Sequence, residues 1–147
     1  MGKYFGTDGF RGEANINLTS EHAYRVGRFL GWYYSSPLSG CKSNAYRPRI
    51  VIGKDTRRSS YMLEYSIVAG ITASGADAYM LHVTTTPSVS YVTRQDEFDC
   101  GIMITASHNP KEYNGYKAYW ADGAQINPEQ AKIVSTERSK FDVLDTE

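Results

Sequence analysis

Residues 50–60 read IVIGKDTRRSS, and this stretch decides the fold. The β-branched run 50–52 predicts a short buried strand that ends at Gly53. The polar residues after it predict a loop. Apolar residues then recur at helical spacing from Leu63 onward, and Gly75 stands where a helix needs its C-terminal cap. The stretch therefore predicts a strand, a polar loop and a helix in succession.

The same alternation continues on both sides of this unit. A helix is predicted over residues 19–34, with Thr19 as its cap, and a third helix is expected to begin with the capping hydroxyl of Thr86 and Pro87. Asn114-Gly115 is a hairpin-type turn dipeptide. The remaining predictions are a loop at 35–48, strands at 78–83, 101–104 and 116–120, and a last helix at 128–140.

Alternating strands and helices place the chain in the α/β class with a largely parallel sheet. Three polar loops directly follow strands, at residues 53–59, 84–87 and 105–110. In a parallel sheet, such loops gather at one edge, where these folds bind ligands. We therefore expect one shared site built from the three loops.

Composition narrows the class of protein. The chain has 147 residues, which suits one domain, and its formal net charge of zero provides no basic field for nucleic acid. No apolar run reaches the length of a membrane span, and Cys41 and Cys100 form no paired motif, so a reduced, cytoplasmic setting is expected. The twelve tyrosines are interpreted as packing at a core edge or an interface.

The loop at residues 105–110, TASHNP, contains the candidate nucleophile Ser107. A hydroxyl nucleophile needs exposure and nearby donors, and the adjacent His108 can donate to a phosphate. The same residue types also form ordinary turns. Local chemistry alone therefore leaves both interpretations open.

Three further segments carry charges that suit a phosphate. The run GTDGFRG at residues 6–12 can offer backbone N–H groups and the Arg11 guanidinium, or can form a tight turn with an Asp–Arg pair. The charges at residues 54–58 can order the neighbouring loop or form a surface turn. Lys117 can return towards Ser107 through a hairpin, or remain an ordinary exposed lysine. His22, on a helix surface, and His82, in a strand, are predicted to be structural.

Four segments together resemble the α-D-phosphohexomutases, in that family's order and from Lys3 to about Val134. They are KYFGTDGFRG at 3–12, IGKDTR at 52–57, TTPSV at 85–89, and TASHNP at 105–110 with YNGYK at 113–117. The first half looks most like the bacterial phosphoglucosamine mutase branch. Residues 111–125 look closer to the phosphoglucomutase and phosphomannomutase branches, so the sugar stays open between them.

The resemblance implies a four-domain enzyme of which residues 1–147 form domain I, with domains II–IV absent. That domain is a three-layer α/β/α sandwich with a mixed, mostly parallel sheet. Ser107 would carry a phosphoryl group between hexose phosphates through a hexose 1,6-bisphosphate. Mg²⁺ would be held by a phosphoryl oxygen on Ser107 and by ligands of the second domain. Arg11, His108 and Lys117 would lie near the reacting phosphate. The loops of the site would be supported by Thr7, Asp8, Asp55, Arg57 and Asn109.

The expected function is therefore that of the N-terminal domain of a phosphoglucosamine mutase, which interconverts glucosamine 6-phosphate and glucosamine 1-phosphate. The chain alone is expected to be inactive and to need domains II–IV of the same polypeptide. The alternatives are domain I of a phosphoglucomutase or phosphomannomutase, and a non-catalytic domain for binding or assembly, for example as a homodimer.

Overall fold

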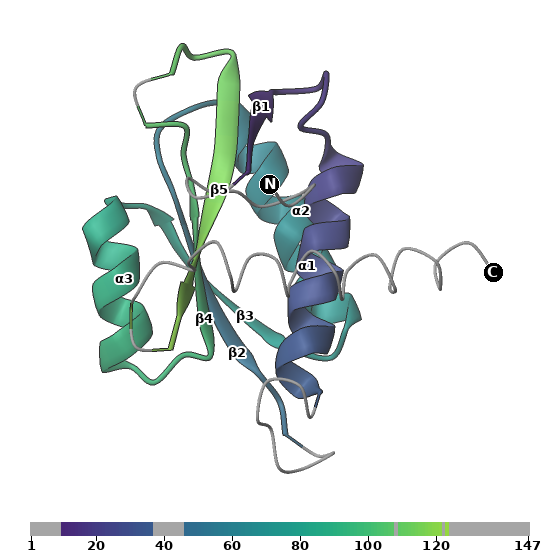
Figure 1. The fold of residues 1–147 in the computed structure, drawn as a ribbon, viewed down its shortest axis with the longest axis vertical. Helices are drawn as coiled ribbons and strands as arrows, with labels where there is room; N and C mark the ends of the chain where they lie inside the picture. Colours follow the sequence, from purple (N-terminus) through teal and green to yellow (C-terminus); the bar gives the residue numbers. More distant parts are fainter. Residues whose placement is uncertain (1–9, 37–45, 108, 122, 124–147) are drawn as a thin grey trace, which may run out of the picture.

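Strands and helices alternate in the computed structural model, which describes residues 10–36, 46–107, 109–121 and 123 (Figure 1). The elements are β1 (Phe10–Glu13), α1 (Ser20–Ser35), β2 (Arg49–Lys54), α2 (Ser59–Ala73), β3 (Asp77–Val83), α3 (Thr86–Gln95), β4 (Cys100–Ile104) and β5 (Tyr113–Trp120). The predicted helix at 128–140, part of the predicted loop at 35–48, and Thr7, Asp8 and His108 lie outside the described residues.

The five strands form one sheet in the order β1-β5-β4-β2-β3. β2 is parallel to both β3 and β4, while β5 is antiparallel to β4 and to β1. The sheet is therefore mixed, and its parallel part is limited to three neighbouring strands. No strand was predicted at β1: residues 6–12 were interpreted as a phosphate-contacting run or a tight turn, and the four residues of β1, FRGE, show no apolar alternation.

Helices cover both faces of this sheet, which confirms the α/β/α sandwich. α1 and α2 share one large core with the strands, including Phe29, Ile67 and Ile102. α3 covers the opposite face, where Val89 packs with Met103 and Tyr119. Figure 1 shows α3 on one side of the sheet and the α1–α2 pair on the other. No helix in the described part of the chain is long and apolar enough to cross a membrane.

α1 and α2 approach each other closely at two glycines. A Cβ built on Gly27 would lie 2.2 Å from the carbonyl oxygen of Ile67, and one built on Gly70 would lie 2.1 Å from that of Tyr24. Both obstacles are backbone atoms of the facing helix, which cannot rotate away. The crossing therefore depends on the missing side chains.

Capping residues begin and end the helices largely as predicted. The Thr19 side chain accepts a hydrogen bond from the amide of His22, and Gly75 follows α2 with a φ of +82°. The start of α3 differs by one residue. Its cap is Thr85, which accepts from the amide of Ser88, so Pro87 occupies the second helical position and not the first.

The prediction of a turn at Asn114-Gly115 is wrong, because both residues lie inside β5. Gly115 is opposite Arg11 of β1, and a Cβ there would lie 2.1 Å from the carbonyl oxygen of Phe10. The glycine thus permits close pairing of two strands. The chain turns earlier, where the amide of Tyr113 donates to the carbonyl oxygen of Pro110 over 3.0 Å.

His22 lies on α1 but is not a simple surface residue. Its Nδ1 forms a hydrogen bond with the Tyr116 hydroxyl, and its ring stacks on Phe10 at 4.3 Å between centroids. These contacts tie α1 to β1 and β5. His82 lies in β3 as predicted, with its side chain 66% exposed.

Lys54 belongs to β2 and not to the polar loop that was predicted to contain it. Its side chain is 1% exposed, and its Nζ lies 2.8 Å from Oε1 of the buried Glu64. The Tyr61 ring covers the ammonium group, with its centroid 3.6 Å from Nζ. A buried lysine needs such partners, and this pair joins the end of β2 to α2.

Cys100 begins β4 in the core, and burial raises the pKa of its thiol to about 12. Well below pH 9 the thiol is protonated in both the folded and the unfolded chain, so ionisation of Cys100 does not lower the free energy of unfolding and the stability from its burial is fully present. That contribution is lost as the pH rises from about 9 towards 12, where only the unfolded chain ionises readily.

At pH 8 we expect Cys100 to react with iodoacetamide at least about 1000-fold more slowly in the folded chain than in urea. Peptide mass mapping measures this rate, and equal rates would contradict the burial.

Candidate functional site

Ser107 lies in the loop that leaves the carboxyl end of β4. Its side chain is exposed, while the preceding Ala106 is fully buried. The Ser107 amide donates to Oγ1 of Thr105 over 3.1 Å, and the Asn109 amide donates to the carbonyl oxygen of Ala106. The φ of Ser107 is +55°, a left-handed conformation that costs a residue with a Cβ about 1 kcal/mol or more. Contacts around the loop must therefore hold this conformation.

Those contacts come mainly from Arg57, in the loop after β2. Its Nη2 donates to the carbonyl oxygen of Ser107 over 3.0 Å. Its Nη1 lies within hydrogen-bonding distance of three more carbonyl oxygens, those of Asn109 (2.9 Å), Pro110 (2.7 Å) and Tyr113 (3.2 Å). One guanidinium group thus contacts four carbonyl oxygens between Ser107 and Tyr113 and holds the loop in one conformation.

Asp55 holds Arg57 and joins the two loops. Its Oδ1 accepts from the Arg57 amide (3.1 Å) and from the Ser60 hydroxyl (2.9 Å). Its Oδ2 accepts from Nε of Arg57 (2.9 Å) and from the Thr105 hydroxyl (2.9 Å). Because each oxygen already has two donors, Asp55 is suited to ordering the loops and poorly suited to acting as a base or metal ligand.

Arg11 and Lys117 lie on the α3 side of the sheet. Lys117 is opposite Met103, which packs on α3, and Arg11 is opposite Gly115, two residues before Lys117. Directly paired residues and alternate residues share a face, so both cations project to the same side. Nε of Arg11 is buried and has no hydrogen-bond partner among the described residues.

The Ser107 loop is close to both strands that carry these cations. The Thr105 amide donates to the carbonyl oxygen of Gly115, so the loop begins level with Arg11 and two strands away from it. Two strand spacings amount to about 10 Å, within reach of an arginine side chain and a phosphoryl group together. An anion that projects from the Ser107 loop to this face would therefore meet positive charge.

Two of the three loops expected to share a site are brought together. The loops after β2 and β4 meet through Asp55 and Arg57. The loop after β3 instead caps α3 with Thr85, and the amide of Thr84 donates to the carbonyl oxygen of Lys54. No hydrogen bond joins residues 84–87 to the Ser107 loop in the described part of the chain.

The sequence interpretation missed Ser60 and Asn114, which are both fully buried beside this site. Asn114 was read as a turn residue. Its Nδ2 donates to the hydroxyls of Ser59 and Ser60 at the start of α2. Serines in the first turn of a helix are common, so no local signal marked these residues.

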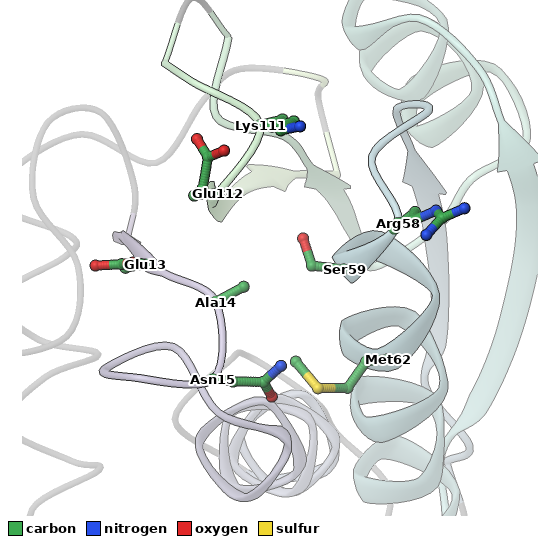
Figure 2. A pocket seen from close by; sticks show the side chains of 8 residues that line it. All are labelled: Glu13, Ala14, Asn15, Arg58, Ser59, Met62, Lys111 and Glu112. Carbon is green, nitrogen blue, oxygen red and sulfur yellow. The ribbon is translucent and has the colours of Figure 1, made fainter.

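A pocket of about 450 Å³ lies beside the first turn of α2 (Figure 2). Figure 2 shows Ala14, Ser59 and Met62 around its centre, while the Glu13 and Arg58 side chains point away from it. The pocket includes neither Ser107, Arg11 nor Lys117. Because its charged groups do not converge, we assign the candidate site to the Ser107 loop.

The described residues alone do not form a metal centre. They contain no group of three or more His, Cys, Asp or Glu side chains placed to hold an ion. Asp55, which accepts from Thr105 at the start of the loop, already has two donors on each oxygen.

Comparison with known proteins agrees with this arrangement. Residues 2–142 match the family described as phosphoglucomutase/phosphomannomutase, alpha/beta/alpha domain I. A phosphoglucosamine mutase of Lachnoclostridium phytofermentans is 63% identical over 134 residues, which are 91% of this chain and 28% of the relative. A phosphoglucosamine mutase of Lachnospira eligens is 68% identical over 126 residues, or 86% of this chain and 27% of that protein.

A solved structure shows the same fold. A putative phosphomannomutase from Thermus thermophilus superimposes with a TM-score of 0.77 and 27% identity, over 92% of this chain and 30% of that one. The chain thus spans less than a third of the length of these proteins. From its matching sequence and its α/β/α architecture, the chain belongs to the phosphoglucomutase/phosphomannomutase family and corresponds to its domain I.

Proposed function

We propose that this chain is the phosphoryl-carrying domain of a phosphoglucosamine mutase, with Ser107 as the carrier. The observation that supports the proposal is the conformation of the Ser107 loop, which Arg57 holds in place. Arg57 holds the carbonyl oxygens of the loop, while the Ser107 hydroxyl is exposed and makes no hydrogen bond to the described residues. The names of the relatives favour glucosamine phosphate over glucose or mannose phosphate as substrate.

The transfer needs a phosphorylated Ser107. The bond from Oγ to phosphorus breaks, a new bond forms from phosphorus to a hydroxyl of the hexose monophosphate, and the proton of that hydroxyl passes to Oγ. The resulting hexose 1,6-bisphosphate reorients and returns its other phosphoryl group to Ser107. Such transfers depend on positioning and on neutralising negative charge. Arg11 and Lys117 would supply that charge, and Lys117 or His108 would carry the proton.

The proposal assigns Mg²⁺ to a phosphoryl oxygen of Ser107 and to ligands beyond the described residues, because the described side chains cannot complete its coordination. The ion would neutralise charge on the transferring group. Thr7, Asp8 and Asn109 would support the loops. Residues 1–147 would act with domains II–IV in a cytoplasmic enzyme.

A homodimer that serves only assembly is the second candidate, and the exposed tyrosines Tyr61, Tyr65 and Tyr91 leave surface for it.

Intact-mass spectrometry after incubation with glucose 1,6-bisphosphate tests the carrier role. We expect one phosphoryl group on the chain when domains II–IV are supplied, and none on the Ser107→Ala variant. Ser20→Ala, which removes another exposed hydroxyl, should still be phosphorylated. A gain that persists without Ser107, or no gain in the complete assembly, would reject the proposal. The chain alone should not convert glucosamine 6-phosphate with Mg²⁺, and measurable turnover would refute its dependence on the other domains.

A further inference from the structure

A buried chain of hydrogen bonds runs from β5 to the Ser107 loop. It begins at Asn114, whose side chain is fully buried on the α1–α2 side of the sheet. Nδ2 of Asn114 donates to the Ser60 hydroxyl over 3.0 Å, and Oδ1 accepts from the amide of Gly115. We call the set Asn114, Ser60, Asp55 and Thr105 the carboxylate network.

The direction of each bond in the carboxylate network is determined by Asp55. An ionised carboxylate only accepts, so the single hydroxyl hydrogens of Ser60 and Thr105 must both point to it. The Ser60 oxygen is then left to accept from Asn114, and the Thr105 oxygen to accept from the amide of Ser107. The network is therefore continuous from Asn114 to the backbone of Ser107, with every member satisfied.

The carboxylate network also connects the strand that carries Lys117 with the loop that carries Ser107. Asn114 and Lys117 lie on the same strand but face opposite sides of the sheet. The network fixes β5, which presents Lys117, relative to the loop that presents Ser107. A shift of β5 or of the loop would separate the Lys117 ammonium group from a phosphoryl group on Ser107, and small displacements are costly in such transfers.

We propose that Asn114 and Ser60 are positioning residues for the phosphoryl carrier, acting through Asp55 and Thr105 on the conformation of Ser107. The inference rests on the proposed function of Ser107. Neither residue would touch the substrate.

Ser59 and Ser60 provide a matched pair for the test. Both hydroxyls accept from Nδ2 of Asn114, at 2.9 and 3.0 Å, but only that of Ser60 passes a hydrogen bond on to Asp55. Amide hydrogen exchange at Ser107, measured by NMR and compared with Ile102 in β4, separates local opening from global unfolding. We expect Ser60→Ala to accelerate exchange at Ser107 about fivefold or more relative to Ile102, and Ser59→Ala to change it less than about twofold.

Further variants make the test decisive. Asn114→Ala should resemble Ser60→Ala, and the double variant should add little, because both changes interrupt one path. If Asn114→Ala does not fold, the serine pair still decides. Equal effects of Ser59→Ala and Ser60→Ala, or no effect on Ser107, would overturn the inference.

Phosphorylation kinetics separate this inference from the proposed function. With domains II–IV and glucose 1,6-bisphosphate supplied, Ser60→Ala should slow phosphorylation of Ser107 at least about fivefold without changing the half-saturating bisphosphate concentration. A raised half-saturating concentration at an unchanged maximal rate would overturn the positioning role. Failure of Ser107 to accept phosphate in the unmodified protein would reject the carrier, while selective exchange at Ser107 would still establish the network as a structural device.

Discussion

Replacing Gly70 by alanine is expected to destabilise the chain by about 3 kcal/mol or more. The added Cβ would lie 2.1 Å from the carbonyl oxygen of Tyr24 and 2.7 Å from the amide nitrogen of Arg28, both in the backbone of α1. The two helices must separate to admit it, and the core between them loses its packing. Urea denaturation followed by circular dichroism measures the change.

Helix propensity alone predicts the opposite result, since alanine is favoured over glycine inside a helix by about 1 kcal/mol. A stabilised Gly70→Ala variant would therefore contradict the close crossing of α1 and α2. Thr72→Ala, on the exposed side of the same helix, is the control and should change stability by less than about 0.5 kcal/mol.

Replacing Arg57 by alanine should lower the free energy of unfolding by about 2–3 kcal/mol and abolish phosphorylation of Ser107. The change removes the donors to four loop carbonyl oxygens and leaves Asp55 without its cation. Ser107 then loses the contacts that hold its left-handed conformation. Thermal denaturation and intact-mass spectrometry of the complete assembly report the two effects.

Lysine at position 57 separates charge from geometry. A lysine keeps the positive charge but cannot donate to Asp55 and several carbonyl oxygens at once, so Arg57→Lys should remain clearly impaired. Arg25→Ala, which removes an exposed ion pair with Glu21, should cost about 0.3–0.5 kcal/mol and leave phosphorylation intact. An Arg57→Lys variant with unchanged stability and phosphorylation would show that charge alone suffices.

Hydrophobic spacing in the sequence predicted the central part of the fold. The periodicity from Leu63 and the cap at Thr19 located α2 and α1, the β-branched run at 50–52 located β2, and the short apolar stretch at 101–104 located β4. The two helices bury one face each, and β2 and β4 are buried almost throughout, so short apolar patterns in the sequence mark all four elements. Asp55, Arg57 and Ser107 could be grouped because the loops after parallel strands meet at one edge.

Other features depend on contacts between distant segments and have no local pattern. β1 is a strand only because β5 pairs with it. The dipeptide Asn114-Gly115 has the composition of a turn. In the folded chain, however, the Asn114 side chain donates hydrogen bonds to two serines of α2, and the missing side chain of Gly115 allows β1 to approach. Lys54 looks like a loop residue until Glu64 is placed beside it.

The pairing of β1 with β5 determines when the site can assemble during synthesis. Arg11 lies opposite Gly115, about 100 positions later in the chain, so a ribosome working at about 5–20 residues per second makes the two about 5–20 s apart. The parallel strands between them are complete before that pairing begins. Arg11 is therefore made well before its partner strand and is among the last groups to join the sheet, and a chain interrupted before β5 would lack this cation at its Ser107 loop.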